Sequence, residues 1–336
     1  MSTPNILPLP RGDRRLIAVA IALFAALLLL PLVGSALMVD KLTLLFVYVM
    51  IAMMWNLMAG YAGLVSVGQQ AFVGLGGYAM IRLVDAGMPP FPAIFAGAAL
   101  TLFAAWVLSW FVLRMKAGEF AIATWVLAEV IRSLVSFDPL IQGETGTSLV
   151  ALNAYDPDLR RNAIYLLALG SVAVMLVFTW RLLRGRLGAE SQAIRDDEEA
   201  AASVGISTMR VKRMIYLAAA FGIALAGGLW LASAITFQPR TAFGVQWSVF
   251  MLFMVLVGGL GSFIGPILGA ILFFALQEIF GDFGAWYLAG IGLVAIGFAL
   301  YVPRGLVGLW QDRGRAEPLS MRKLLNNDPI LKKETP

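Results

Sequence analysis

Residues 56–78 read NLMAGYAGLVSVGQQAFVGLGGY, an apolar stretch interrupted by glycines and uncharged polar side chains. Six glycines fall between residues 60 and 77, and each glycine inside a helix costs roughly 0.8–1 kcal/mol relative to alanine. A helix that only anchors a chain in lipid has no reason to accept that cost. Glycine lets neighbouring helices approach closely, or lets a broken helix turn backbone groups toward a cavity. Both interpretations place this stretch inside a bundle of membrane helices.

The composition of the whole chain supports a membrane location. Of its 336 residues, 60% are apolar and only 13% are charged, whereas a soluble domain carries about 25% charge. A spanning helix needs about 20 apolar residues. Six nearly charge-free runs approach or exceed that length: 16–34, 42–59, 91–113, 163–183, 214–237 and 285–302. Four less uniform stretches are also expected to span: 60–82, 119–136, 247–263 and 264–280. The sequence therefore predicts an all-α polytopic membrane protein with about ten transmembrane helices.

The distribution of charge predicts the orientation of these helices, because loops on the cytoplasmic side carry the excess of Lys and Arg. Basic residues concentrate on one side: Arg11, Arg14, Arg15, Arg114, Lys116, the group from 181 to 213, and Arg304 with the tail after it. The alternate loops hold Asp85, Asp138, Glu144, Asp156, Asp158 and Asp282, with Lys41, Arg160, Arg161 and Arg240 as exceptions. We expect both termini to be cytoplasmic.

This orientation divides the chain into three parts. Residues 1–15 form a cytoplasmic N-terminal segment, 16–303 form the transmembrane domain, and 304–336 form a cytoplasmic tail. The connection 184–213 is expected to be cytoplasmic and the loop 137–162 to be periplasmic. The run after Arg15 also has features of a secretory signal, including the small residues 34–36. It is about 18 residues long, however, and signal cores have roughly 7–15, so a retained first helix is favoured over a cleaved signal.

Several functional classes are excluded by residues that the sequence lacks. It contains no cysteine and no histidine, which removes disulfides, thiolate nucleophiles, imidazole bases and the usual transition-metal ligands. No G-x4-G-K-[ST] phosphate loop occurs, so this chain is expected to hydrolyse no ATP and to bind no cofactor. The basic residues lie beside hydrophobic ends, which indicates membrane orientation and argues against nucleic-acid binding.

Residues 195–206, RDDEEAAASVGI, form a polar segment in the predicted cytoplasmic connection. Asp196 and Asp197 are placed to start a helix, and Gly205 is placed to end it in the left-handed conformation, which predicts about two and a half turns. Such a short helix is marginal alone and must pack on something. Ala200, Ala201 and Val204 offer a small apolar face. The alternative is a solvated helix that only joins two spans.

The spacing within this segment resembles a known motif. Glu199-Ala200-Ala201, three residues, Gly205, nine residues, then Ile215 and Leu217 resemble the E-A-A-x3-G-x9-I-x-L-P loop of ABC importer permeases, with Ala218 in place of the proline. In that family the loop is a short helix that docks on a cytoplasmic ATPase. The resemblance therefore implies that ATPase coupling involves Asp197, Glu198, Glu199, Ala200, Ala201 and Gly205.

Three further stretches resemble the LivM-type permeases of branched-chain amino acid importers: residues 56–78, residues 248–269 (SVFMLFMVLVGGLGSFIGPILG) and residues 301–309 (YVPRGLVGL). The resemblance implies the ABC importer permease fold, a bacterial inner membrane, a LivH-like second permease, two cytoplasmic ABC ATPases and a periplasmic solute-binding protein. It implies leucine, isoleucine or valine as the solute, with urea, short amides or aromatic acids as alternatives. Two departures bear on the substrate: Gln69-Gln70 stand where many members have Gly-His, and QGETGTS at 142–148 replaces a T-G-G-x-x-G pattern.

Polar residues in the apolar segments are candidates for a translocation pathway: Asn56, Ser66, Gln69, Gln70, Glu129 and Arg132. Glu129 and Arg132 lie three residues apart, and an ion pair that holds the bundle together is the favoured reading of this pair. Gly261, Gly265 and Gly269 are expected to pack helices.

The resemblance leaves two other functional classes open. GLVS at 63–66 and GLGS at 259–262 hint at a repeat, and broken segments in two halves also suit an ion-coupled secondary transporter. Such a transporter has no need for the EAA and glycine spacing at 199–205. A structural membrane scaffold is a third class.

Overall fold

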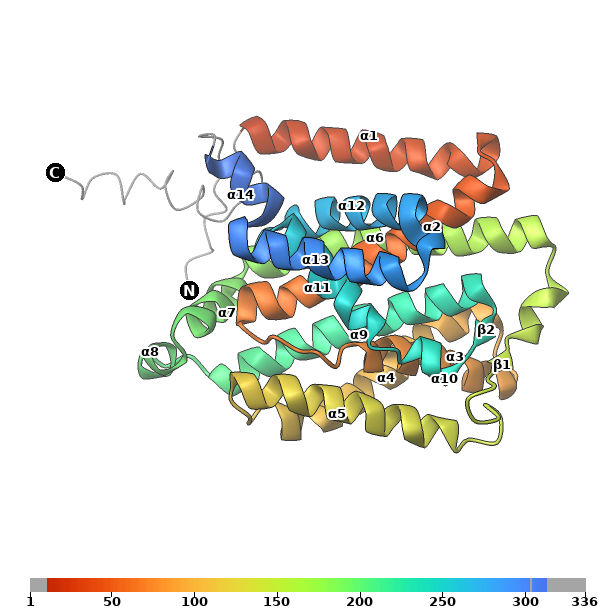
Figure 1. Cartoon of the computed structure of the whole chain (residues 1–336), viewed down its shortest axis with the longest axis horizontal. Helices are drawn as coiled ribbons and strands as arrows, with labels where there is room; N and C mark the ends of the chain where they lie inside the picture. Colours follow the sequence, from red (N-terminus) through yellow and green to blue (C-terminus); the bar gives the residue numbers. More distant parts are fainter. Residues whose placement is uncertain (1–10, 303, 313–336) are drawn as a thin grey trace, which may run out of the picture.

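The computed structural model describes residues 11–302 and 304–312, which form a bundle of long, roughly parallel helices (Figure 1). The long helices are α1 (Arg11–Val33), α2 (Ala36–Ala62), α3 (Gln70–Asp85), α4 (Pro90–Val112), α5 (Ala117–Ser136), α6 (Pro157–Arg184), α9 (Thr208–Ala234), α11 (Gln246–Gly258), α12 (Gly265–Phe280) and α13 (Ala285–Tyr301). The short elements are β1 (Thr147–Ser148), η1 (Val150–Ala154), α7 (Arg186–Asp196), α8 (Glu198–Ser203), β2 (Thr236–Phe237), α10 (Pro239–Ala242), η2 (Gly281–Phe283) and α14 (Gly305–Asp312).

Nine of the ten predicted segments each overlap one long helix, and the polytopic, mostly helical prediction agrees with the structure. The tenth, 60–82, is wrong as a single span, because α2 ends at Ala62 and α3 begins only at Gln70. In the described part of the chain, seven helical stretches are long and apolar enough to cross a membrane. The helices α1, α3 and α5 are not among them, and ten spans therefore stays a prediction. Most of the predicted segments 1–15 and 304–336 lies outside the described residues.

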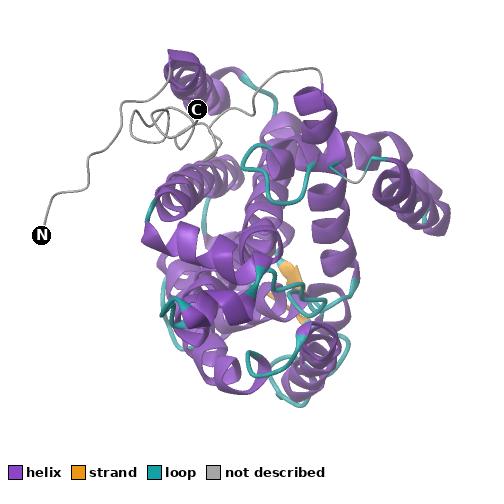
Figure 2. Cartoon of the chain, turned by 90° about the vertical axis from the view of Figure 1, so that its left-hand side faces the viewer, coloured by secondary structure: helices purple, strands orange, loops and turns teal. Residues whose placement is uncertain are grey.

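The bundle has two distinct ends (Figure 1). The first, which we call the α8 end, carries α7 and α8, and the last turn of α2 lies there beside α7. The second, which we call the strand end, carries β1 and β2, and there Asp40 near the start of α2 pairs with Arg161 near the start of α6. Figure 2 looks at the molecule from the α8 end, with many of the helices seen nearly end-on.

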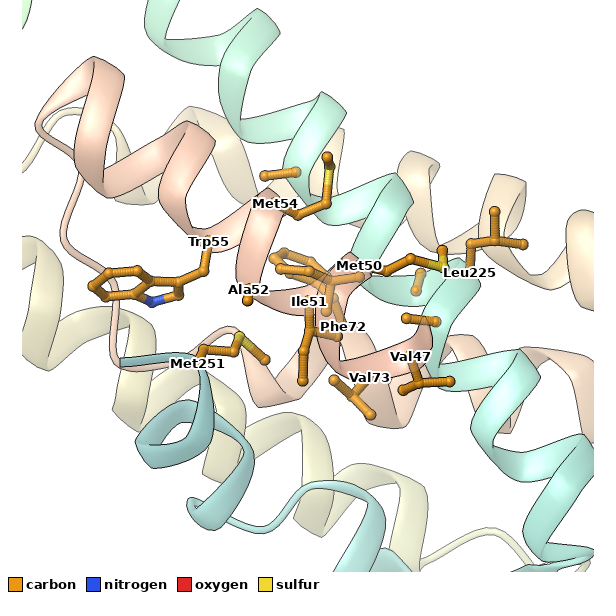
Figure 3. Packing of buried hydrophobic residues seen from close by; sticks show 14 of the residues in the cluster. Val47, Met50, Ile51, Ala52, Met54, Trp55, Phe72, Val73, Leu225 and Met251 are labelled. Carbon is orange, nitrogen blue, oxygen red and sulfur yellow. The ribbon is translucent and has the colours of Figure 1, made fainter. Parts of the chain in front are cut away.

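Helix α2 forms the core of the bundle. Every residue from Phe46 to Ala62 is buried, and α2 packs against α6, α9, α11 and α12. A helix that is apolar all round belongs in the interior. Met50 and Ile51 of α2 lie among Phe72 of α3 and other buried side chains (Figure 3). Because lipid tails are as apolar as these side chains, close packing and hydrogen bonds, not the exclusion of water, hold such helices together.

The glycines of the opening stretch bring α3 into backbone contact with α9. A Cβ atom added to Gly76 of α3 would overlap the carbonyl of Ala224, and one added to Gly227 of α9 would overlap the carbonyl of Val73. The two contacts are reciprocal, so each helix seats one glycine on the backbone of the other. Of the two interpretations of the glycines, this contact agrees with close approach between neighbouring helices.

Two breaks interrupt the helices at the positions of the GLVS and GLGS sequences. Gly63 ends α2 with a φ of +69°, and Gly259 and Gly261 separate α11 from α12 with φ of +131° and +74°. After each break a serine hydroxyl accepts a backbone bond: Ser66 from the amide of Gly68 at 3.2 Å, and Ser262 from the amide of Gly265 at 2.9 Å. The two breaks thus share a local structure.

The loop at the strand end is folded by its acidic residues. Asp138 is 9% exposed, and its carboxylate accepts hydrogen bonds from the Tyr78 hydroxyl at 2.6 Å and the Leu140 amide at 3.0 Å. The Arg82 guanidinium lies 2.8 Å away. Burial of the carboxylate opposes its ionisation, but these partners outweigh that effect and hold the pKa of Asp138 below its ordinary value. This loop also supplies β1, which pairs antiparallel with β2.

We expect Gly227→Val to destabilise the protein, because the new side chain would overlap the backbone of α3. Overpacking of this kind costs about 1–3 kcal/mol, and more where a backbone must move. Thermal unfolding of the detergent-solubilised chain measures it. The control is Gly170→Val on α6, where a Cβ meets no atom within 4 Å. Equal melting temperatures for both variants would contradict the close contact.

We expect Asp138→Asn to lower stability at pH 7 by roughly 1–3 kcal/mol, because Arg82 and Tyr78 lose the charge that they stabilise. The pKa of Asp138 is lower in the folded protein than in the unfolded chain. Its contribution is therefore present above the unfolded pKa, about 3.9, and is lost as the pH falls through the folded pKa. Thermal unfolding across this range should show an acid-dependent loss in the wild type that the variant lacks. Asp85→Asn, whose ion pair with Arg82 is exposed and 3.6 Å long, is the control.

Candidate coupling and transport site

The connection between α6 and α9 folds into two helices, α7 and α8. Asp197 separates them because its backbone is extended, with φ −159° and ψ 106°. Its carboxylate Oδ1 accepts hydrogen bonds from the amides of Glu199 and Ala200, both at 3.0 Å, which caps α8. The prediction of one helix of two and a half turns is therefore wrong. Asp196 ends α7, and α8 has only six residues.

The end of α8 follows the predicted chemistry. Gly205 has a φ of +87°, the left-handed conformation that the sequence predicts, and its amide donates to the carbonyl of Ala202 at 3.0 Å. The next amide, of Ile206, donates to the carbonyl of Ala201 at 3.1 Å. No atom lies within 4 Å of a Cβ added to Gly205, so the turn faces open space.

The apolar face predicted for this helix is divided in the structure. Ala201 is 4% exposed and packs inward, whereas Val204 is 77% exposed and Ala200 is also exposed. The reason is that α8 ends at Ser203, so Val204 lies beyond the helix, and that Ala200 precedes Ala201 by one residue and therefore points to another side. Within α8 every residue except Ala201 is exposed, and so is Val204, which follows its last residue.

An ion pair attaches α8 to the first turns of α9. The ammonium of Lys212 lies 2.6 Å from both carboxylate oxygens of Glu198, and the Lys212 side chain is only 12% exposed. Glu199, by contrast, makes no ion pair with any residue that the structure describes. Among the predicted coupling acids, Asp197 and Glu198 therefore hold the helix in place, and Glu199 is free for an outside partner.

A further contact attaches α7 to α2. Nη1 of Arg195 donates a hydrogen bond to the carbonyl of Gly60 at 2.8 Å, and its Nε donates to Asp196 at 2.9 Å. The sequence gives no signal for this contact beyond an Arg in the last turn of α7, because Gly60 lies 135 residues earlier. The coupling segment is thus bonded directly to the central helix of the bundle.

Four of the predicted pathway residues come together in the interior: Asn56, Ser66, Gln69 and Gln70 are all 0–1% exposed. Both ends of the Asn56 side-chain amide bond the backbone of the second helix break. Its Nδ2 donates to the carbonyl of Ser262 at 2.8 Å, and its Oδ1 accepts from the amide of Gly261 at 2.8 Å. The preceding residue, Trp55, donates from its indole to the carbonyl of Ser66 at 3.0 Å. Consecutive residues of α2 therefore hold the two breaks.

The two glutamines at the start of α3 are only partly bonded. Nε2 of Gln69 donates to the Ser66 hydroxyl at 3.1 Å, and the hydroxyl of Ser248 donates to Oε1 of Gln70. Oε1 of Gln69 and Nε2 of Gln70 have no hydrogen-bond partner among the residues that the structure describes. The cavity that Gln69 borders measures about 10 Å³, whereas ligand pockets measure about 300–1,000 Å³. In this conformation the space beside Gln69 holds about one water molecule, and no solute fits there.

The other two predicted pathway residues lie elsewhere, on the outer face of α5. Nε of Arg132 donates to Glu129 at 2.9 Å, and its Nη1 donates to Glu144 of the strand-end loop. The side chains of Glu129 and Arg132 are 43% and 28% exposed, and Glu129 lines a surface groove with Trp125 and Ser133. A charged face on a membrane helix is expected to meet protein or water, not lipid tails.

The three predicted packing glycines do not form one row on a helix. Gly261 lies in the break, and α12 begins only at Gly265, whose amide donates to the Ser262 hydroxyl and which Pro266 follows. Gly269 does lie on α12, so close to Met254 of α11 that a Cβ would overlap its carbonyl. Gly261 instead lies beside Gly60, where α2 ends.

The chain is similar in sequence to three characterised membrane permeases. The branched-chain amino acid permease LivM of Escherichia coli (strain K12) is 28% identical over 315 residues, which cover 85% of this chain and 74% of the relative. LivM of Salmonella typhimurium is 27% identical over 305 residues, 82% of this chain and 71% of the relative. The fructose import permease FruG of Bifidobacterium longum is 27% identical over 251 residues, 69% of this chain and 72% of the relative. No solved structure matches the chain.

The match to a protein family covers most of the chain. Residues 37–304 match the family described as branched-chain amino acid transport system / permease component. This range includes α2 to α13, both helix breaks and the α7–α8 segment. The protein is therefore a member of the branched-chain amino acid transport system permease family.

Proposed function

We propose that this chain is one of two membrane-spanning subunits of an ATP-driven ABC importer for branched-chain amino acids in a bacterial inner membrane. A LivH-like second permease, two cytoplasmic ABC ATPases and a periplasmic solute-binding protein complete the importer. Family membership supports the permease role, and the names of the two LivM relatives support the substrate class.

The observation that carries this proposal is α8. It is capped at both ends, tied to α9 through Glu198 and Lys212, and located at one end of the bundle with Glu199 and Val204 exposed (Figure 1). A connection that only joined two spans would need neither this capping nor this attachment. A helix that is held firmly and exposed on its outer side suits docking on a second protein, here the ATPase.

The charge distribution supports a cytoplasmic location for the α8 end. Arg184, Arg186, Arg195 and Lys212 lie in the α7–α8 segment or beside it, whereas Asp138 and Glu144 lie in the loop at the strand end. Cytoplasmic loops carry the excess of basic residues. The strand end then faces the periplasm, where the binding protein delivers its solute.

The buried polar residues bear on the route of the solute. Gln69 borders a cavity of about 10 Å³, which has no room for an amino acid in this conformation. We infer that the pathway runs along the surface of this chain, between it and the second permease. The exposed ion pair of Glu129 and Arg132 makes the α5 face a candidate for that shared surface.

A second candidate substrate class is a sugar, because the fructose import permease FruG is also similar to this chain. In such systems the binding protein largely sets the specificity, and this chain does not contain it. The amino acid is favoured because both LivM relatives cover more of this chain than FruG does.

We expect uptake to require ATP and the binding protein. The full complex, purified with its own partners, is reconstituted in liposomes, and uptake of labelled leucine and of labelled fructose is compared with and without ATP. Leucine uptake that depends on both ATP and the binding protein is the expected result. Uptake of fructose without uptake of leucine would show that the substrate is a sugar and not an amino acid. Uptake by this chain alone, driven by an ion gradient, would overturn the proposal.

We expect Glu199→Arg and Gly205→Asp to uncouple ATP hydrolysis from transport. Glu199 is exposed without an ion-pair partner, and Gly205 holds a left-handed conformation that an aspartate adopts poorly. Leucine uptake should fall at least about tenfold, the effect of losing one charge-assisted contact, while the protein still inserts. Asp282→Arg, an exposed charge reversal at the strand end, is the control and should keep full uptake. Normal transport by both coupling variants would show that α8 is not the docking element.

A further inference from the structure

We infer that Arg195 is the positioning residue through which movement of the α7–α8 segment reaches α2 and the break between α11 and α12. The inference rests on the proposed ATP-driven function and names the contact that transmits it. Figure 1 shows α7 and α8 side by side at one end of the bundle, with the end of α2 beside α7.

Arg195 satisfies a backbone group that α2 itself cannot bond. The carbonyl groups in the last turn of a helix have no partner within that helix. One of these, the carbonyl of Gly60, accepts a hydrogen bond from Arg195 at 2.8 Å. A guanidinium at a helix C-terminus also interacts favourably with the helix dipole. Arg195 therefore caps α2 from another segment of the chain.

The local packing leaves Arg195 little freedom to move independently of α2. A Cβ added to Gly63, which ends α2 in the left-handed conformation, would lie 3.3–3.6 Å from Cγ, Cα and Cβ of Arg195. The guanidinium is also held from its other side, since Asp196 accepts from Nε at 2.9 Å. The stem of Arg195 thus packs on the end of α2 while its head is bonded on two sides.

The same point of α2 touches the second helix break. A Cβ added to Gly60 would lie 2.6 Å from the amide nitrogen of Gly261, and one added to Gly261 would lie 3.5 Å from Nη1 of Arg195. One turn earlier in α2, Asn56 bonds the backbone of Gly261 and Ser262. Three elements therefore meet at Arg195: the last turn of α7, the end of α2 and the break before α12.

The contacts of Arg195 differ from those expected of a basic residue that only sets the orientation of the chain in the membrane. A residue that only marks the cytoplasmic side would remain in water, as the 89% exposed side chain of Arg186 does on the same helix. Arg195 instead forms a continuous series of contacts from α7 through Gly60 and Asn56 to residues 261–262. A displacement of α7 beyond what the Arg195 side chain can follow must either move α2 with it or break the bond to Gly60, because a hydrogen bond weakens steeply beyond about 3.2 Å.

The test is transport per ATP hydrolysed by the complete reconstituted complex. We expect Arg195→Met, which keeps the packing stem and removes the donors, to lower the leucine transported per ATP about tenfold while ATP hydrolysis continues. Arg195→Lys keeps the charge without the planar fork and should give an intermediate value. Arg186→Met is the matched control on α7 and should match the wild type.

A second readout does not depend on transport. The chain has no cysteine, so Leu260→Cys, at a position 45% exposed within the break, gives a single site for maleimide labelling. ATP should change the labelling rate at this site in the complex that is otherwise wild type, and Arg195→Met should abolish that change.

The outcomes separate the two proposals. Wild-type transport per ATP and wild-type ATP-dependent labelling in the Arg195→Met complex would overturn the role of Arg195. A second pattern would also overturn this role: the Arg195→Lys complex equals the wild type, and the Arg195→Met complex differs from it only in the amount of protein inserted. That pattern would show that the charge of Arg195 sets the membrane topology and does not transmit movement. If the wild-type complex itself takes up leucine without ATP, the proposed function fails instead.

Discussion

The requirement that every backbone polar group be bonded inside the membrane governs this structure. A helix meets it automatically, but at each break N–H and C=O groups lose their helical partners and must be bonded by other parts of the chain. Two adjacent side chains of α2 meet the requirement at both breaks: Trp55 bonds the carbonyl of Ser66, and Asn56 bonds the carbonyl of Ser262. The helix at the centre of the bundle is therefore also the element that permits irregular backbone on either side of it.

This constraint explains why polar residues occur in the oily interior without forming a solute site. Asn56 uses both ends of its amide on backbone groups, and Ser66 accepts from Gly68 and Gln69. Near the breaks, Gln69 and Gln70 each retain one atom without a partner among the described residues, and Gln69 borders a space of about one water molecule. Polarity at membrane depth is thus first a means of closing the backbone, and a polar residue there does not by itself mark a route for solute.

The sequence predicted the parts of this structure that depend on local patterns. Apolar runs predicted most of the long helices, although the start of α3 was misplaced, and the left-handed Gly205 followed from its place after the alanines. The division between α7 and α8 was missed, because the extended backbone of Asp197 is one of several conformations open to an acidic run. The contact of Arg195 with Gly60 could not be predicted, since it joins segments 135 residues apart. The same limit explains why Glu129 was grouped with Gln69, although they face different surroundings.

The reciprocal seating of Gly76 and Gly227 has a mechanical consequence. With each glycine pressed on a carbonyl of the other helix, α3 and α9 can neither slide nor rotate past one another without overlap. Gly97 of α4 lies similarly close to the amide of Met80 on α3. These three helices should therefore travel as one rigid body during any transport cycle. Deformation is then left to elements with fewer contacts, such as α1, and the close glycine contacts determine which helices move together.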